Sequence, residues 1–433
     1  MLLLIKLRRN FARYAKFTRK VLSNCNKLGK ELQKMMDLRL VFWETTRACN
    51  LECPHCRAQA QKSRSPDELS TLEAKSFIDQ LSALAKPILV FSGGEALVRE
   101  DIYELIHYAH SRGLKATLAT NAALIDQDVA GRLKESGILL TAVSIYGSTA
   151  QAHDDFCGRP GAFARTLAGI ENIKSAGIKL QINTTITRKN LSELENIGAL
   201  ALRLGAVSYH VFFLVPVGRG LALEGDEISP LEYEEAFNRL YDFQQNFPLH
   251  IKPTCAPHYY RILRQRSVKE KNNPPVTRQL TVDLSFCHSR ESGNPGDMDS
   301  PVTPAKAGAG NDRIHPSIDR LHPSLNRNGF HAVTKGCLAG QGVCFVSYRG
   351  EVFGCGYLPL AAGDLRKQSF REIWLESELF KALRDDSRLS GKCGICEFKK
   401  VCGGCRARGY WASGDYLSPE PYCVYEPAGK LSE

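Results

Sequence analysis

Residues 43–57 read Trp43-Glu-Thr-Thr-Arg-Ala-Cys49-Asn-Leu-Glu-Cys53-Pro-His-Cys56-Arg57, in which three cysteines with the spacing CxxxCxxC follow a short apolar run. Three thiolates close together on one loop can hold three irons of a 4Fe–4S cube, which leaves the fourth iron without a protein ligand. An open position on a metal is what catalysis needs, because a small molecule can occupy it. Structural zinc is the alternative, but the adjacency of His55 to Cys56 makes joint ligation awkward.

A second motif, Ser92-Gly-Gly-Glu95, follows the next apolar run. Its two glycines allow a backbone to approach a ligand closely, because neither carries a Cβ atom. The glutamate carboxylate can bind an ammonium group. The Gly-Gly-Glu string alone is a weak signal, but its place after the second predicted strand, with CxxxCxxC after the first, is a strong one.

Between residues 40 and 214, short β-rich runs alternate with amphipathic stretches. Strands are predicted at 40–43, 88–91, 115–120, 139–144, 179–185 and 208–214, and helices at 71–85, 101–112, 127–136 and 191–204. A glycine that can end a helix stands before four of these strands: Gly113, Gly137, Gly177 and Gly205. Repeated βαβ units follow, so we predict an α/β fold, a partial (β/α)6 barrel with its chemistry at the carboxyl ends of the strands.

The two motifs together resemble the radical SAM superfamily, over roughly residues 38–220. The resemblance implies that Cys49, Cys53 and Cys56 hold a catalytic 4Fe–4S cluster whose open iron binds S-adenosylmethionine (SAM). Contacts to SAM would come from five further residues: Gly93, Gly94 and Glu95 at its methionyl end, and Ser144 and Asn183 at its ribose or carboxylate. Cleavage of SAM would then give a 5′-deoxyadenosyl radical, which takes hydrogen from an unactivated carbon.

Three positions depart from the pattern of that superfamily. Ala96 stands where proline often follows Gly-Gly-Glu, and Tyr146 stands where an aspartate is usual after the fourth strand. Cys157 occupies a position where arginine is frequent. We interpret Cys157 as a small buried side chain rather than a redox group.

The C-terminal cysteines resemble the SPASM extension of radical SAM proteins, over about residues 337–425. The resemblance implies two auxiliary 4Fe–4S sites with four cysteines each. One would use Cys393, Cys396, Cys402 and Cys423, and the other Cys337, Cys355 and Cys405. Cys344 is the candidate for the fourth ligand of the second site, and without Cys344 that cluster would have an open iron. A zinc ribbon is the alternative. Cys25, Cys255 and Cys287 have no partner spacing and are interpreted as incidental.

The net charge of +11 does not indicate a nucleic-acid partner, because residues 1–36 carry ten basic residues and one acid, and the remainder has a net charge of only +2. That basic stretch is interpreted as an over-extended start or as a helix lying on a membrane surface. No run is long enough for a transmembrane segment, and we expect a cytoplasmic protein. Many cysteines in a reducing compartment favour metal sites over disulfides.

Five segments are predicted: a basic tail or mis-assigned start at 1–36, a radical SAM barrel at 37–220, a helical bridging region at 221–284, a disordered repeat-like insertion at 285–330, and a SPASM domain at 331–433. The insertion is rich in Ser, Gly, Asn, Asp and Pro and shows no hydrophobic period. A further helix is predicted at 230–247.

Three strings resemble the Fe-coproporphyrin III decarboxylases of the alternative haem pathway: residues 43–57, residues 212–220 and residues 350–359. The resemblance implies oxidative decarboxylation of propionates to vinyl groups, with reduced ferredoxin or flavodoxin as the electron donor. Haem d1 and sirohaem-pathway enzymes, SPASM peptide maturases and a non-catalytic iron–sulfur scaffold are the alternatives. Arg219 could bind a propionate, because its planar fork suits a carboxylate. His210 could touch the substrate or its iron.

Overall fold

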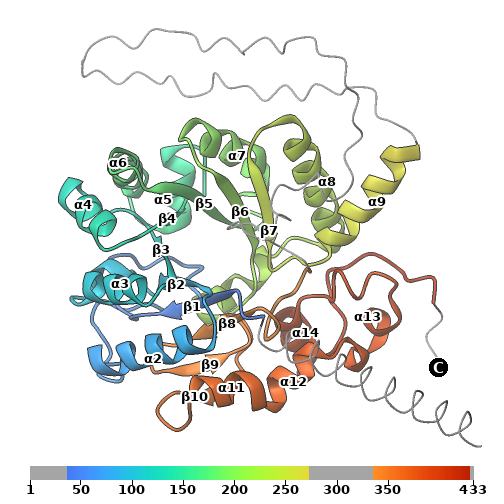
Figure 1. The fold of residues 1–433 in the computed structure, drawn as a ribbon. Helices are drawn as coiled ribbons and strands as arrows, with labels where there is room; N and C mark the ends of the chain where they lie inside the picture. Colours follow the sequence, from blue (N-terminus) through green and yellow to red (C-terminus); the bar gives the residue numbers. More distant parts are fainter. Residues whose placement is uncertain (1–36, 273–334, 430–433) are drawn as a thin grey trace, which may run out of the picture.

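The structure is a computed structural model and describes residues 37–272 and 335–429 (Figure 1). The predicted tail at 1–36, the predicted insertion at 285–330, Cys25 and Cys287 lie outside the described residues. In the two described ranges, none of the helices combines the length and the apolar character that crossing a membrane requires.

Ten strands of the described residues form one sheet in the order β10-β9-β8-β1-β2-β3-β4-β5-β6-β7. They are β1 (Leu40–Glu44), β2 (Ile88–Ser92), β3 (Lys115–Thr120), β4 (Leu140–Ser144), β5 (Lys179–Ile186), β6 (Ser208–Phe213), β7 (His250–Thr254), β8 (Val343–Val346), β9 (Glu351–Phe353) and β10 (Ala361–Asp364). Strands β1 to β7 pair in parallel, and β8 adds in parallel to the other side of β1. The predicted α/β class with an open barrel is confirmed, since the two edge strands of the sheet in the described residues, β7 and β10, do not pair with each other.

Helices follow most of the strands of the barrel and cover its outside (Figure 1). The helices are α2 (Thr71–Leu84), α3 (Ile102–Ser111), α4 (Gln127–Glu135), α5 (Ala150–Cys157), α6 (Ala162–Ser175), α7 (Leu194–Arg203), α8 (Pro230–Asn246), α9 (Tyr259–Asn272), α11 (Phe370–Glu376), α12 (Glu378–Arg384), α13 (Gly391–Ile395) and α14 (Arg406–Ser413). Shorter 3-10 turns lie at Ala96–Val98, Leu191–Glu193, Gly218–Asp226 and Asp386–Arg388. The four glycines predicted to end helices have φ between 67° and 94°, as that role requires.

The prediction missed one strand of the barrel. Strand β7 reads His-Ile-Lys-Pro-Thr, and a proline argues against a central strand because it cannot donate to the ladder. The structure accommodates Pro253 because β7 lies at the edge of the sheet and pairs only with β6. With β7, and with β8 on the other side of β1, the parallel run contains eight strands in the described residues, where six were predicted.

Successive side chains of each strand point alternately to the outer face of the sheet, which the helices cover, and to its inner face, which lines the barrel. In β6, Tyr209, Val211 and Phe213 belong to the core beneath the helices, so His210 faces the barrel interior. In β7, Ile251 belongs to the same core, which turns Lys252 inward. The register places four inner residues in one row across β4 to β7: Ser144, Asn183, His210 and Lys252.

Candidate functional site

The CxxxCxxC loop begins at the carboxyl end of β1 and brings its three thiols together. Burial raises the pKa of Cys49 to about 12, and the charges of Glu95, Cys53 and Cys56 act in the same direction. The Cys49 sulfur accepts a hydrogen bond from Leu51 N at 3.3 Å, and the Cys56 sulfur accepts one from Ala60 N at 3.4 Å. Backbone donors thus already face two of the sulfurs, which suits thiolates bound to a metal cluster.

The two glycines of the second motif place the cysteine loop through backbone contacts. A Cβ on Gly93 would lie 2.5 Å from Thr46 O, and a Cβ on Gly94 would lie 2.3 Å from Ala48 O. Gly94 N donates to Thr46 O at 2.8 Å, and Glu95 N donates to Ala48 O at 2.8 Å. The two glycines were predicted to let the backbone approach a ligand closely. In the structure they approach the backbone of the segment that leads into Cys49.

The Glu95 carboxylate is fully buried and receives hydrogen bonds from the end of β3. Thr120 Oγ1 lies 2.8 and 2.9 Å from its two oxygens, and Asn121 N donates at 2.9 Å. Burial raises the pKa of Glu95, while these hydrogen bonds lower it. The Glu95 side chain thereby joins the ends of β2 and β3. Because its carboxylate is engaged in these hydrogen bonds, the Gly-Gly-Glu motif presents backbone groups, rather than this carboxylate, to a ligand.

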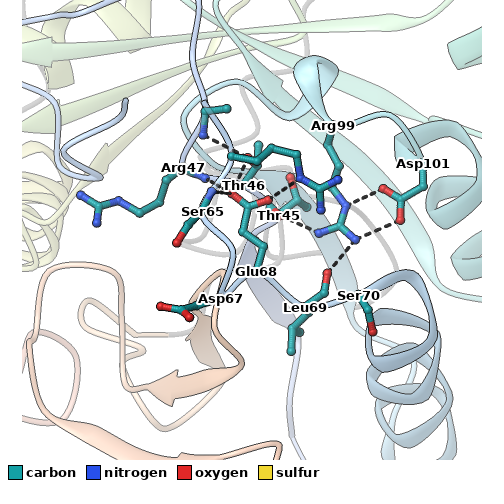
Figure 2. A network of polar contacts seen from close by, with 12 residues as sticks. Thr45, Thr46, Arg47, Ser65, Asp67, Glu68, Leu69, Ser70, Arg99 and Asp101 are labelled. Atoms are coloured by element: carbon teal, nitrogen blue, oxygen red, sulfur yellow. Dashed lines mark hydrogen bonds and ion pairs between the residues drawn. The ribbon is translucent and has the colours of Figure 1, made fainter. Parts of the chain in front are cut away.

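A polar network holds the backbone between β1 and Cys49 from the other side (Figure 2). The buried Glu68 carboxylate accepts hydrogen bonds from Thr46 Oγ1 at 2.7 Å and from Arg47 N at 3.0 Å. Buried Arg99 donates to Thr45 O at 2.8 Å, to Leu69 O at 2.9 Å and to the Asp101 carboxylate at 2.6 Å. The first turn of the cysteine loop is thus fixed before any ligand binds.

Replacing Arg99 with methionine is expected to lower the free energy of unfolding by about 3–5 kcal/mol, because Asp101 and two buried carbonyl groups would lose their donor. Anaerobic urea unfolding followed by circular dichroism measures the change. Lys62→Met is the control, since Lys62 is 84% exposed and lies 3.9 Å from Glu52. A surface pair of this kind contributes about 1 kcal/mol or less. Equal losses in both variants would contradict the role assigned to the network.

Ser144, the last residue of β4, pairs with Asn183 within β5, so the two residues predicted to contact SAM are neighbours in the sheet. The Tyr146 hydroxyl neighbours the Ser144 side chain, so the residue that replaces the usual aspartate lies beside this position. The Tyr146 ring stacks on Phe156 at 4.8 Å and meets the edge of His55 at 4.4 Å. Burial lowers the pKa of His55 to about 3, which leaves it neutral inside this aromatic cluster.

Cys157 is buried, as predicted, but its surroundings are not those of an isolated small side chain. Its sulfur lies 3.4 Å from His153 Nε2 and is hydrogen-bonded to Cys53. The residue therefore packs directly against the cysteine loop.

Arg219 and His210, the two predicted substrate contacts, both have partners in the protein. Arg219 Nε donates to Cys53 O at 2.9 Å and Nη1 donates to Ala60 O at 2.7 Å, so this guanidinium holds the cysteine loop. Its Nη2 has no hydrogen-bond partner within the described residues. His210 Nδ1 lies 3.1 Å from Gln181 Nε2 on the inner face of the barrel.

Four C-terminal cysteines line one pocket: Cys393, Cys396, Cys402 and Cys423. These are the four residues assigned to one auxiliary site. Arg261 and Lys392 line the same pocket, and both lower the pKa of Cys423, which burial raises. The pocket offers four thiols and two cations, which suits a cluster of negative net charge. No three His, Cys, Asp or Glu side chains in residues 37–272 and 335–429 converge closely enough for a single metal ion.

The other C-terminal group contains a cysteine that the sequence analysis set aside. Burial raises the pKa of Cys255, and the charges of Cys405, Cys355 and Cys337 raise it further, so the four thiols are neighbours. Burial likewise raises the pKa values of Cys405 and Cys355, and the charge of their neighbour Cys337 raises them further. Arg408 of α14 brings this group to the barrel by donating to Cys255 O and, at 3.0 Å, to Phe213 O.

Cys344, the predicted fourth ligand of that group, lies elsewhere. It pairs with Val41 in the sheet and is fully buried in the core under the helices. Burial raises its pKa, and its charged neighbour is Arg384 rather than another cysteine. The signal that could have identified Cys255 is its place directly after a strand of the barrel, which is also the place of Cys49.

Comparison with known proteins agrees with this geometry. Residues 43–201 match the radical SAM superfamily, and residues 337–405 match the SPASM iron–sulfur cluster-binding domain. The chain is 45% identical to an AdoMet-dependent heme synthase of Methanosarcina barkeri, over 90% of this chain and 98% of that protein. It is 43% identical to an AdoMet-dependent heme synthase of Oleidesulfovibrio alaskensis, over 90% of this chain and 88% of that protein.

A solved structure shares the fold over nearly the whole chain. SuiB of Streptococcus suis, bound to its precursor peptide SuiA, superposes with a TM-score of 0.62. The match covers 94% of this chain and 81% of that chain, at 14% sequence identity. Barrel and C-terminal module therefore share one architecture in the two proteins.

Proposed function

The chain belongs to the AdoMet-dependent haem synthase family within the radical SAM superfamily, and from this membership we propose that it decarboxylates two propionates of Fe-coproporphyrin III to vinyl groups, giving haem b. The observation that carries the proposal is the 45% identity to a haem synthase over 90% of the chain. The three groups of cysteines around the open barrel support it, because each suits an iron–sulfur cluster.

When bound, SAM and its cluster would supply a radical able to remove one hydrogen atom from a propionate, and the auxiliary site would supply an acceptor for the electron left when carbon dioxide departs. We assign Cys49, Cys53 and Cys56 to the catalytic cluster. Gly93 and Gly94 hold that loop at the mouth of the barrel, and Ser144 and Asn183 bind SAM beside it.

The auxiliary sites are assigned by proximity. One uses Cys393, Cys396, Cys402 and Cys423, which share a pocket. The other uses Cys337, Cys355, Cys405 and Cys255, and Cys344 remains a core residue. Arg219 keeps the catalytic loop in place through two backbone carbonyls. We further propose that the protein works in the reducing cytoplasm with reduced ferredoxin or flavodoxin as its electron donor.

The test is anaerobic reconstitution with iron and sulfide, followed by reduction and incubation with SAM and Fe-coproporphyrin III. Chromatography with mass spectrometry would follow 5′-deoxyadenosine and the loss of one and then two carbon dioxide units from the porphyrin. Both products together are expected. Iron-free coproporphyrin III serves as the substrate control. 5′-Deoxyadenosine with an unchanged porphyrin would overturn the substrate assignment, and neither product from a fully loaded protein would overturn the enzyme assignment.

A further inference from the structure

Lys252 is a cation inside the barrel that belongs neither to the proposed cluster ligands nor to the proposed SAM contacts. It lies in the middle of β7, between Ile251 of the core and Pro253, so its side chain faces the interior. Its register partner on β6 is His210, whose partner on β5 is Asn183. Neighbouring strands are about 4.8 Å apart, so the backbone of Lys252 lies roughly 10 Å from that of Asn183, within reach of one extended ligand.

No carboxylate pairs with Lys252 in the described part of the chain, where its side chain makes no hydrogen bond and no ion pair, and its charged neighbour is the Cys255 thiol. Burial lowers the pKa of Lys252, as expected for an ammonium group removed from water without a carboxylate beside it. Two carboxylates near the mouth already have partners, since Glu44 lies 3.1 Å from Arg57 and Glu95 accepts hydrogen bonds from Thr120 and Asn121. An ammonium group that lies inside the protein without a carboxylate partner is costly, and a ligand carboxylate would relieve the cost.

Lys252 also lies between the two groups of residues assigned to the reaction. On one side, the row across the sheet leads through His210 and Asn183 to Ser144. On the other side, the chain continues from β7 into Cys255, whose thiol is the charged neighbour of the Lys252 ammonium. A carboxylate bound to Lys252 would thus be held between the SAM contacts and the auxiliary group of Cys255.

We propose that Lys252 binds a propionate carboxylate of the tetrapyrrole and so orients the macrocycle across the inner face of the barrel. This inference rests on the proposed function and deepens it by naming the residue that recognises the substrate. The ammonium group supplies up to three N–H donors, and an ion pair formed away from bulk water is stronger than one at the surface.

The test compares Lys252→Met with the wild type and with Lys179→Met. Lys179 is exposed at the opposite end of β5, so its replacement removes one positive charge far from the mouth of the barrel. The dissociation constant for Fe-coproporphyrin III would be measured from the porphyrin absorbance in the reconstituted protein without reductant, so that no turnover occurs. Lys252→Met is expected to weaken binding roughly 10- to 100-fold, whereas Lys179→Met leaves it within about twofold.

Two further measurements separate recognition of a carboxylate from a structural role. Lys252→Arg, which keeps the positive charge, should restore most of the affinity. The tetramethyl ester of Fe-coproporphyrin III, which carries no carboxylate, should bind Lys252→Met and wild type equally. Haem formation by the wild type with unchanged binding in Lys252→Met would overturn this inference alone. A wild type that neither binds nor converts the porphyrin would overturn the proposed function and this inference with it.

Discussion

Replacing Cys255 with alanine is expected to lower the iron content of the reconstituted protein from about twelve to between about eight and eleven atoms per chain, and to reduce haem formation more than tenfold. Four thiols meet in this group, and the loss of one would leave an iron without a protein ligand or prevent the cluster from assembling. Either result changes the potential of the site that accepts the electron. Iron analysis, electron paramagnetic resonance and the haem assay measure these effects.

Cys344→Ala is the matched control for that experiment. Cys344 is more deeply buried than Cys255, and it packs in the core beside Val41 with Arg384 rather than another cysteine as its charged neighbour. Its replacement should cost about 1–2 kcal/mol of stability through lost packing and leave the iron content unchanged. If Cys344→Ala lost iron and Cys255→Ala did not, the ligand assignment would be reversed in favour of the spacing in the sequence.

The contrast between these two cysteines illustrates what the sequence could and could not predict. Cys344 lies inside the cysteine-rich segment, so sequence proximity favoured it, but the β8 register turns its side chain into the core. Cys255 lies about eighty residues upstream, outside any motif, and comes into place only because β7 joins the edge of the barrel beside β6. When two separate segments of the chain contribute the cysteines of one site, the site can be predicted only from the sheet topology. The spacing of cysteines in the sequence does not contain that information.

Local patterns predicted the barrel itself well. All six predicted strands agree with the observed ones to within one residue at each end, and four of them begin shortly after a glycine that ends a helix. The fourth predicted helix differs mainly in its 3-10 first turn. The partners of Arg219 and Glu95 could not be predicted. Both side chains face backbone or side-chain groups that are distant in sequence, such as Cys53 O and Thr120 Oγ1. The roles expected for them were inferred from residue type, whereas the structure engages them in holding the loop and the strand ends.

Replacing Gly94 with alanine is expected to reduce SAM cleavage at least 100-fold. The added Cβ would lie 2.3 Å from Ala48 O and 2.7 Å from Arg47 O, and both are backbone atoms that cannot move without shifting Cys49. A displacement of about 1 Å at a catalytic centre can cost a factor of this size. The yield of 5′-deoxyadenosine per chain measures the effect directly.

Gly131→Ala provides the control for Gly94→Ala, because an added Cβ at this position of α4 meets nothing within 4 Å. Alanine in a helix is favoured over glycine by about 1 kcal/mol, so this variant should be slightly more stable and fully active. Iron bound by the auxiliary cysteines should remain in Gly94→Ala, since the steric conflict is confined to the segment before Cys49. Retained SAM cleavage in Gly94→Ala would mean that the loop can shift at little cost, and that the two glycines do not fix the catalytic cysteines as their backbone contacts indicate.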